Sequence, residues 1–146
     1  MRTIKFRGKK EKTGEWVNGF FAYLHIPDMS DSGQISEGFH SIPSIFNDEP
    51  GNRNRTYWDT VDQKTVGQFS GAFDCEGREI YEGDILSACY GHSPNITEVT
   101  GVVEFVHCGF ALKFGKDAGV WLDQLIHAEI IGNIHDTPEL LKGGEA

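Results

Sequence analysis

Residues 66–86 of this 146-residue chain read VGQFSGAFDCEGREIYEGDIL, and this stretch decides the fold. Two turns interrupt its short apolar runs, DCEG around Gly77 and EGD around Gly83. Both glycines supply a positive φ at little cost, and Asp74 is placed to accept a hydrogen bond within its own turn. We expect Asp84 to accept from the backbone beside Gly83 and so to fix where the next strand begins. The pattern predicts strands joined by tight turns.

Three acidic residues in this stretch have a second interpretation. Glu79, Glu82 and Asp84 could converge as an acid and base pair or as ligands of a hard metal ion. Acidic residues around turns more often form solvated faces, and Asp84 is expected to be structural first. We keep Tyr81, Glu82 and Asp84 as candidate binding residues and assign no catalytic residue.

A family resemblance rests on this stretch and on both ends of the chain. The residues that carry it are 4–7, 66–71, Asp74, Gly77, 79–85, 130–134 and 138–141. With them the chain resembles the YopX-like family, found largely in bacteriophages, prophages and other mobile elements. Ser70 stands where the family usually has Thr, and the pairs 72–73 and 75–76 also depart from its pattern, which alters a turn surface more than a fold. The resemblance implies a small, mostly β phage protein without an established activity.

Length and composition predict one domain over residues 1–146. Hydrophobic residues make up 38% of the chain, and ten Phe, four Tyr and three Trp supply aromatic mass typical of a β core. Eighteen glycines between short apolar runs favour hairpins and bulges over helices.

The first part of the chain predicts a β-hairpin. Residues 3–6 and 15–24 are strand-like and flank a polar turn at 11–14. Gly19 precedes two aromatic residues and marks either a bulge or the close approach of another backbone.

Residues 27–55 are the least regular part of the chain. They are rich in Asp, Ser, Gly, Asn and Pro, with weak strand candidates at 34–36 and 39–46. We expect an irregular insertion here, either a variable loop or a surface that binds a partner.

The second half predicts a run of strands followed by one helix. The expected strands are 84–90, 98–107, 109–114, 120–125 and 128–134. Pro138 suits the first position of a short C-terminal helix. We therefore expect a mainly β fold, with a small SH3-like barrel or pseudo-barrel in the C-terminal half and the N-terminal hairpin packed on it.

Charge disfavours nucleic acid as a partner, with one local exception. Thirteen basic and twenty-two acidic side chains give a net charge of −9, which repels a polyanion at long range. Positive charge nevertheless gathers near the amino end, beside two aromatic residues. That group consists of Lys5, Arg7, Lys9, Lys10 and Lys12 with Trp16 and Phe20. It is either a solvated hairpin face or a site for a nucleic-acid strand.

Cysteine and histidine spacing permits one metal site. Cys89, His92, His107 and Cys108 could form a zinc clip, but two adjacent residues of an extended strand project to opposite faces. A thiol nucleophile beside a histidine, Cys108 with His127 or Cys75 with His135, is a further alternative. We expect neither: no metal, no cofactor and no enzymatic activity.

These observations favour a non-catalytic, self-associating interaction module, a phage or prophage accessory protein that binds itself and an unknown phage or host protein. The alternative is a small barrel that binds nucleic acid through Lys5, Arg7 and Trp16; a zinc- or Cys-dependent enzyme ranks third. No apolar run approaches the ~20 residues of a membrane span, and the start lacks a secretion signal. We expect no membrane partner and a location in the cytoplasm of the bacterial host.

Overall fold

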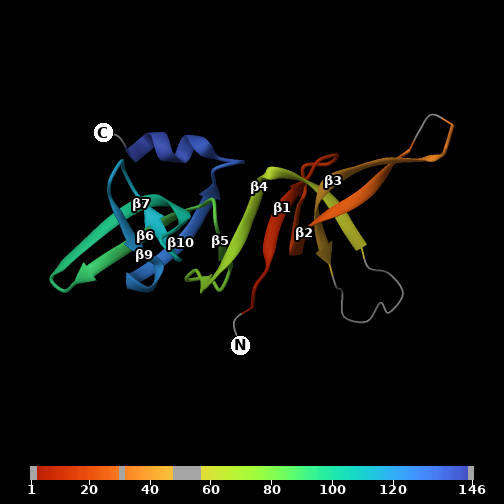
Figure 1. Ribbon diagram of the computed structural model, residues 1–146. Helices are drawn as coiled ribbons and strands as arrows, with labels where there is room; N and C mark the ends of the chain where they lie inside the picture. Colours follow the sequence, from red (N-terminus) through yellow and green to blue (C-terminus); the bar gives the residue numbers. More distant parts are fainter. Residues whose placement is uncertain (1–2, 30–31, 48–56, 145–146) are drawn as a thin grey trace. The chain divides into compact units, whose positions relative to one another are not determined.

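The computed structural model describes residues 3–29, 32–47 and 57–144 (Figure 1). They form two compact units: residues 4–66 are the first, and residues 67–146 together with 1–3 are the second. The elements are β1 (Phe6–Lys10), β2 (Trp16–Met29), β3 (Ile35–Asn47), β4 (Tyr57–Phe73), β5 (Glu79–Tyr81), β6 (Asp84–His92), β7 (Asn95–Val106), β8 (Gly109–Lys113), β9 (Gly119–Trp121), β10 (Leu125–Asn133) and the 3₁₀ helices η1 (Leu122–Gln124) and η2 (Pro138–Gly144). No helix among the described residues has the length and apolar character to cross a membrane.

The first unit is a ring of four strands. Its order is β1-β2-β3-β4, and β1 also pairs with β4, which closes the ring. At the closure the Lys9 N–H donates to the Thr65 hydroxyl (2.8 Å), and the Glu11 N–H donates to the Thr60 carbonyl (3.1 Å). Gly8 faces Val61 across the interior, where a Cβ would lie 3.2 Å from the valine. Small residues therefore let four strands close around a narrow core.

Beyond this ring, β2 and β3 continue as a two-stranded ribbon, which we call the arm (residues 23–29 and 35–43). Their register runs from Tyr23 opposite Pro43 to Met29 opposite Ile35. β1 pairs with β2 only up to Gly19, and β4 pairs with β3 only from Ser44 onward. Within the described residues, the two strands of the arm pair only with each other.

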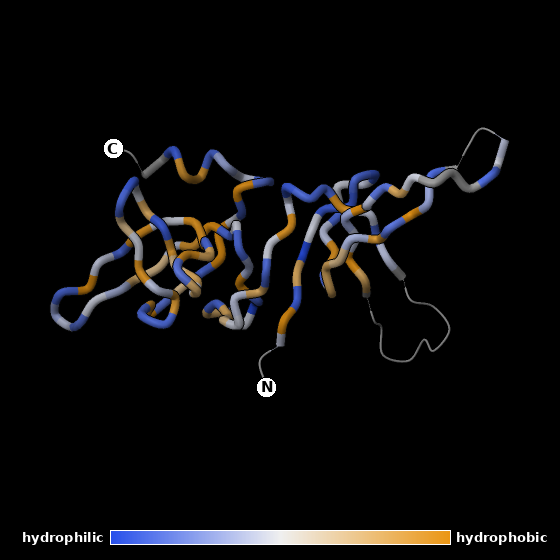
Figure 2. The backbone as a smooth tube through the Cα atoms, viewed as in Figure 1, coloured by the Kyte–Doolittle hydropathy of each residue, from blue (hydrophilic) through white to orange (hydrophobic). Residues whose placement is uncertain are grey.

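The second unit is built on a five-stranded antiparallel sheet in the order β10-β6-β7-β8-β9. Its core consists of the buried side chains of Ile80, Leu86, Ala88, Val103, Phe110 and Leu112. Figure 2 shows hydrophobic residues gathered toward the middle of this unit. The end of β4 pairs with β5, with Phe69 opposite Tyr81, so residues 66–86 lead into this core.

The predicted mainly β fold with a small barrel is confirmed. The closed ring, however, consists of β1–β4, whereas the sequence analysis placed the barrel in the C-terminal half and gave the N-terminal half only a hairpin. That hairpin exists as β1 and β2, but it is part of the ring. Ring closure depends on the pairing of β1 with β4, which are far apart in the chain and leave no local pattern.

Two smaller predictions need correction. The stretch 27–55 is not an irregular insertion where it is described, because β2 runs to Met29 and β3 spans Ile35–Asn47; residues 30–31 and 48–56 lie outside the described residues. The expected C-terminal helix begins at Pro138 but is a 3₁₀ helix. The single domain stays a prediction.

Candidate functional site

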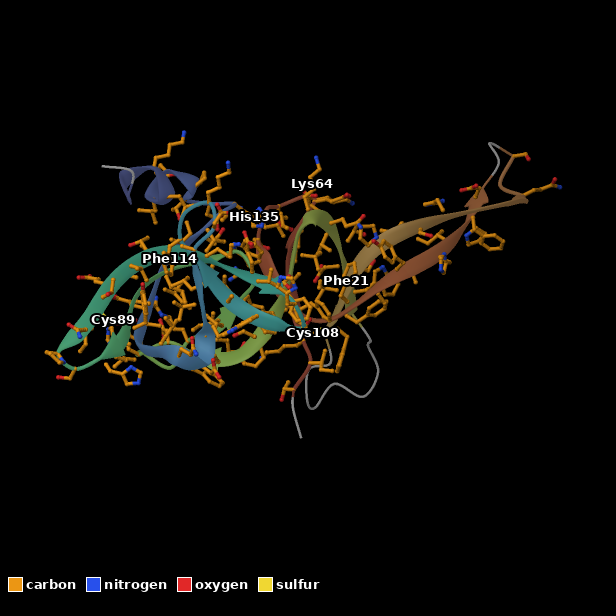
Figure 3. The ribbon with its side chains drawn as sticks, turned by 60° about the vertical axis from the view of Figure 1, so that its left-hand side comes forward. Phe21, Lys64, Cys89, Cys108, Phe114 and His135 are labelled. Carbon is orange, nitrogen blue, oxygen red and sulfur yellow. The ribbon has the colours of Figure 1, made fainter. Side chains whose placement is uncertain are left out.

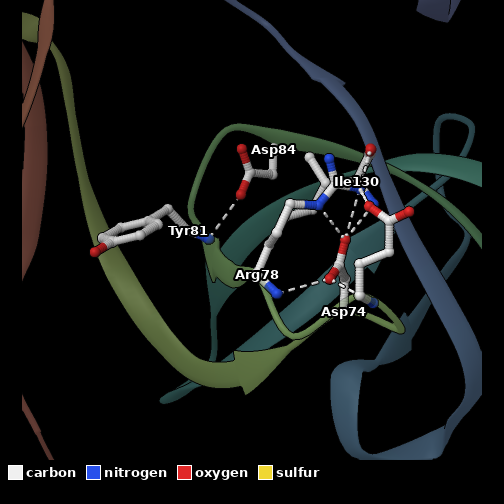
Figure 4. A network of polar contacts seen from close by, with 6 residues as sticks. Asp74, Arg78, Tyr81, Asp84 and Ile130 are labelled. Atoms are coloured by element: carbon white, nitrogen blue, oxygen red, sulfur yellow. Dashed lines mark hydrogen bonds and ion pairs between the residues drawn. The ribbon is translucent and has the colours of Figure 1, made fainter.

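The turn between β4 and β5 is held by one buried carboxylate. Asp74 is 7% exposed and accepts hydrogen bonds from the backbone N–H groups of Glu76 (3.0 Å), Arg78 (2.8 Å) and Ile130 (3.2 Å). The Arg78 Nε donates to the second Asp74 oxygen (2.9 Å), and its terminal nitrogen donates to the Ile130 carbonyl (3.0 Å; Figure 4). Asp74 and Arg78 thus tie the turn to β10.

Electrostatics agree with this geometry. Burial by itself raises the pKa of the Asp74 carboxyl group, but the hydrogen bonds from Arg78, Ile130 and Glu76 outweigh it and hold that pKa below its ordinary value. The hydrogen bond between the Asp74 and Arg78 side chains raises the pKa of the Arg78 guanidinium. Asp74 accepts hydrogen bonds within its own turn, as predicted from the sequence, whereas its contact with Arg78 was not predicted. The signal available was an arginine four residues after a turn aspartate.

Two of the candidate binding residues are buried. Asp84 is 1% exposed, and its Oδ2 accepts a hydrogen bond from the Tyr81 N–H (2.8 Å). This hydrogen bond closes the β5–β6 turn, and its donor lies two residues before Gly83. Tyr81 is also buried, and its hydroxyl donates to Glu79 Oε2 (2.7 Å). Neither side chain is available on the surface of this chain for recognition, because both are buried.

Glu82, the third of these candidates, is only half-buried. Its carboxylate accepts from the Gln68 N–H (3.4 Å), and burial raises its pKa, against the lowering effect of that hydrogen bond. Glu79 and Asp84 accept from different atoms of Tyr81, whereas Glu82 accepts from Gln68, so the three carboxylates do not share one donor group. Among the described residues, no three His, Cys, Asp or Glu side chains gather closely enough to hold a metal ion.

The four residues of the possible zinc clip lie at two ends of the sheet. Cys89 pairs with Glu98 near the start of β7, whereas His107 and Cys108 follow its other end. The nine residue steps from Glu98 to His107 span about 30 Å in an extended strand. Figure 3 shows Cys89 and Cys108 well apart. The structure does not bring these residues together.

The proposed cysteine and histidine pairs are not assembled either. His127 lies opposite Cys89 on β6, whereas Cys108 follows the other end of β7. His135 lies beside Gly83, while the Cys75 N–H donates to Ala128 (2.8 Å), seven residues before His135. Cys75 instead shares a 190 Å³ pocket with His127, a pairing that sequence reasoning missed because it depends on how the turn docks on β10.

The basic cluster of the hairpin divides between two faces. Arg7 and Lys9 alternate with Gly8 and therefore share the outer face of β1. The Arg7 guanidinium carbon lies 4.6 Å from the centre of the Trp16 ring, and the Lys9 ammonium lies 5.4 Å from it. Lys10 is on the inner side, where it pairs with Asp59 (3.6 Å) and Glu15 (3.5 Å). The structure thus keeps Arg7, Lys9 and Trp16 together and removes Lys10 from the group.

A row of aromatic side chains crosses the outside of the same ring, on β2, β3 and β4. Phe20 is directly opposite Phe46, and Phe46 is directly opposite Trp58, on three neighbouring strands. Directly paired residues project to one face of a sheet. Phe20 is 63% exposed and Trp58 is 52% exposed. We call Phe20, Phe46 and Trp58 the aromatic row.

Contacts inside the ring fix the direction of this row. Phe6 packs on Phe21 with the ring centres 5.9 Å apart, and the partner of Phe21 across the sheet, Ile45, is fully buried. Phe21 therefore points inward and its neighbour Phe20 points outward. The sequence analysis named Phe20 but not its two partners, since their alignment depends on the register of β3.

Known proteins that resemble this chain include one family and one solved structure. The family described as YopX protein matches residues 5–142, which confirms the predicted resemblance. The crystal structure of protein EF1440 from Enterococcus faecalis is similar, with a TM-score of 0.52 and 23% identity over 97% of this chain and 99% of that chain. Such a low identity supports the shared fold alone. A search among curated proteins found no match. The chain belongs to the YopX family.

Proposed function

We propose that this protein is a phage or prophage accessory protein that acts in the cytoplasm of the bacterial host by binding, without catalysis of its own. In this proposal it associates with further copies of itself and presents a surface to a phage or host protein. We also interpret the five-stranded sheet of the second unit as SH3-like. The observation that carries the proposal is the arm.

An isolated two-stranded ribbon has little reason to be stable in water. Such ribbons are marginal unless a third strand or another surface covers them. The arm nevertheless extends through six residue pairs. Phe39 is 67% exposed near its far end, and Tyr23 is exposed at its base. Packing against a second copy would cover these aromatic rings and supply the missing partner, which supports self-association.

The acidic residues of the central stretch support the absence of catalysis. Asp74 and Asp84 are each engaged by backbone N–H groups, an arrangement that shapes a turn. The raised pKa of Glu82 has its cause in partial burial, and the hydrogen bond from Gln68 acts against it. These hydrogen bonds give the carboxylates a structural role.

Light scattering at low micromolar protein tests the self-association. We expect a mass above that of the 16.3 kDa chain, and we expect Phe39→Ser to shift the population toward monomer. Phe73→Ser is the matched control, because Phe73 is a comparably exposed phenylalanine outside the arm. A wild-type monomer, or an equal effect of both substitutions, would refute the role of the arm.

A further inference from the structure

We propose that the outer face of the first unit binds single-stranded DNA, with bases stacked on the aromatic row and on Trp16 and with phosphates near Arg7 and Lys9. This inference does not depend on self-association through the arm.

Charge in the chain is divided in a way that favours this face. Residues 4–66 carry eight basic and nine acidic side chains, whereas the rest of the chain carries five basic and thirteen acidic. Almost all of the net charge of −9 therefore belongs to the second unit. The long-range repulsion that argues against a polyanion is weak in the unit that carries Arg7 and Lys9.

Local ion pairs also affect the charge around Arg7 and Lys9. Lys10 pairs with the carboxylates of the exposed Glu15 and the partly exposed Asp59, at 3.5 and 3.6 Å. The residues next to these acids, Trp16 and Trp58, face the outer side, since alternate residues of a strand face opposite sides. The ion pairs with Lys10 partly offset the repulsion of phosphate groups by these two carboxylates.

The aromatic side chains are arranged as a stacking platform. Trp16 and Phe20 are four residues apart on β2, which separates them by about 13 Å along the strand. Phe46 and Trp58 extend the row across β3 and β4. Every base has a π face, so such a surface binds single strands with little sequence preference, and adjacent basic groups provide the salt-dependent part of the affinity.

The same chemistry selects single strands over duplexes. A duplex keeps its bases stacked inside the helix and offers no free π face to these rings.

Fluorescence anisotropy with a labelled oligo(dT) of ~12 nucleotides tests the proposal at low salt. We expect binding that weakens as salt is added, and Trp58→Ala should weaken it about 5- to 150-fold. Trp58→Phe should retain most of the affinity because the stacking surface is kept. Trp121→Ala is the matched control, since Trp121 is an exposed tryptophan of the second unit.

Several outcomes would overturn the proposal. One is the absence of binding at low salt; another is an equal loss from Trp58→Ala and Trp121→Ala in folded protein, verified by circular dichroism. Tighter binding of oligo(U) or of a duplex would show that the face is not built for single-stranded DNA. A change in oligomeric mass without a change in DNA affinity would assign the aromatic row to a second copy instead.

Discussion

At the scale of single residues, Asp74 is the side chain whose loss should cost the most. Asp74→Ala removes the acceptor of three backbone N–H groups and of the Arg78 guanidinium. Buried donors left without an acceptor cost about 1–3 kcal/mol each, with partial relief from water. We expect the free energy of unfolding to fall by about 2–4 kcal/mol, as measured by urea denaturation.

Glu76→Gln is the control for this prediction. Glu76 is exposed, and its carboxylate pairs with the same guanidinium at 3.1 Å. Glu76→Gln therefore removes an exposed ion pair of Arg78 and leaves the buried Asp74 carboxylate in place. Exposed ion pairs contribute about 0–1 kcal/mol. Equal losses for the two variants would mean that the Asp74 network is not what anchors the turn.

The two perturbed carboxyl groups predict opposite responses to pH. The pKa of Asp74 is lowered by folding, so Asp74 stabilises the protein above its ordinary pKa of 3.8, and this stability is lost as the pH falls through the folded value. The pKa of Glu82 is raised, so stability is lost as the pH rises above its ordinary value of 4.5. Unfolding midpoints measured from pH 3 to 7 should show a shallower acid loss for Asp74→Asn. Glu82→Gln should gain stability relative to wild type as the pH rises; the same slope in all three proteins would contradict both assignments.

At the scale of elements, the sequence predicts what is local. Turn residues such as Gly77 and Gly83 predicted the β4–β5 and β5–β6 connections, and the predicted strands 98–107 and 109–114 correspond to β7 and β8. β3 was underestimated because it is rich in polar and small residues and is stabilised by its two neighbours. The closure of β1 on β4, the aromatic row and the contact of Arg78 with Ile130 join distant segments, and no local pattern encodes such pairings.

The structure shows why residue 19 is a glycine. The sequence indicated a bulge or a close approach of another backbone, and a Cβ at Gly19 would collide with the Phe46 carbonyl oxygen. Its φ of +156° is also one that side chains rarely adopt. Since a backbone atom cannot move aside as a side chain can, we expect Gly19→Ala to cost about 2–3 kcal/mol.

Thermal unfolding followed by circular dichroism measures this effect. Gly8→Ala is the comparison, because its Cβ would meet only the Val61 side chain, at 3.2 Å. We expect a smaller loss there. If Gly19→Ala melts at the same temperature as Gly8→Ala, the approach of β3 to β2 is looser than described.

At the scale of the whole molecule, the two units divide the proposed tasks. The arm and the outer face both belong to residues 4–66, while the second unit holds most of the negative charge and the cluster around Leu112. β4 runs through both, since it enters the ring and ends opposite β5. The division implies that the second unit can be weakened without a matching loss in the first.

Leu112→Ala tests this independence, because Leu112 is fully buried in the core of the second unit. Removing a buried leucine side chain costs about 2–5 kcal/mol. Hydrogen exchange measured by mass spectrometry should therefore speed up strongly in β6–β8, whose amides report opening of that core, and much less in β1 and the adjoining part of β2. An equal increase in both units would mean that they unfold together, as expected of the single cooperative domain that chain length and composition predicted. A selective increase would instead assign each unit its own stability, so that the surfaces of the first unit stay folded when the core of the second is weakened.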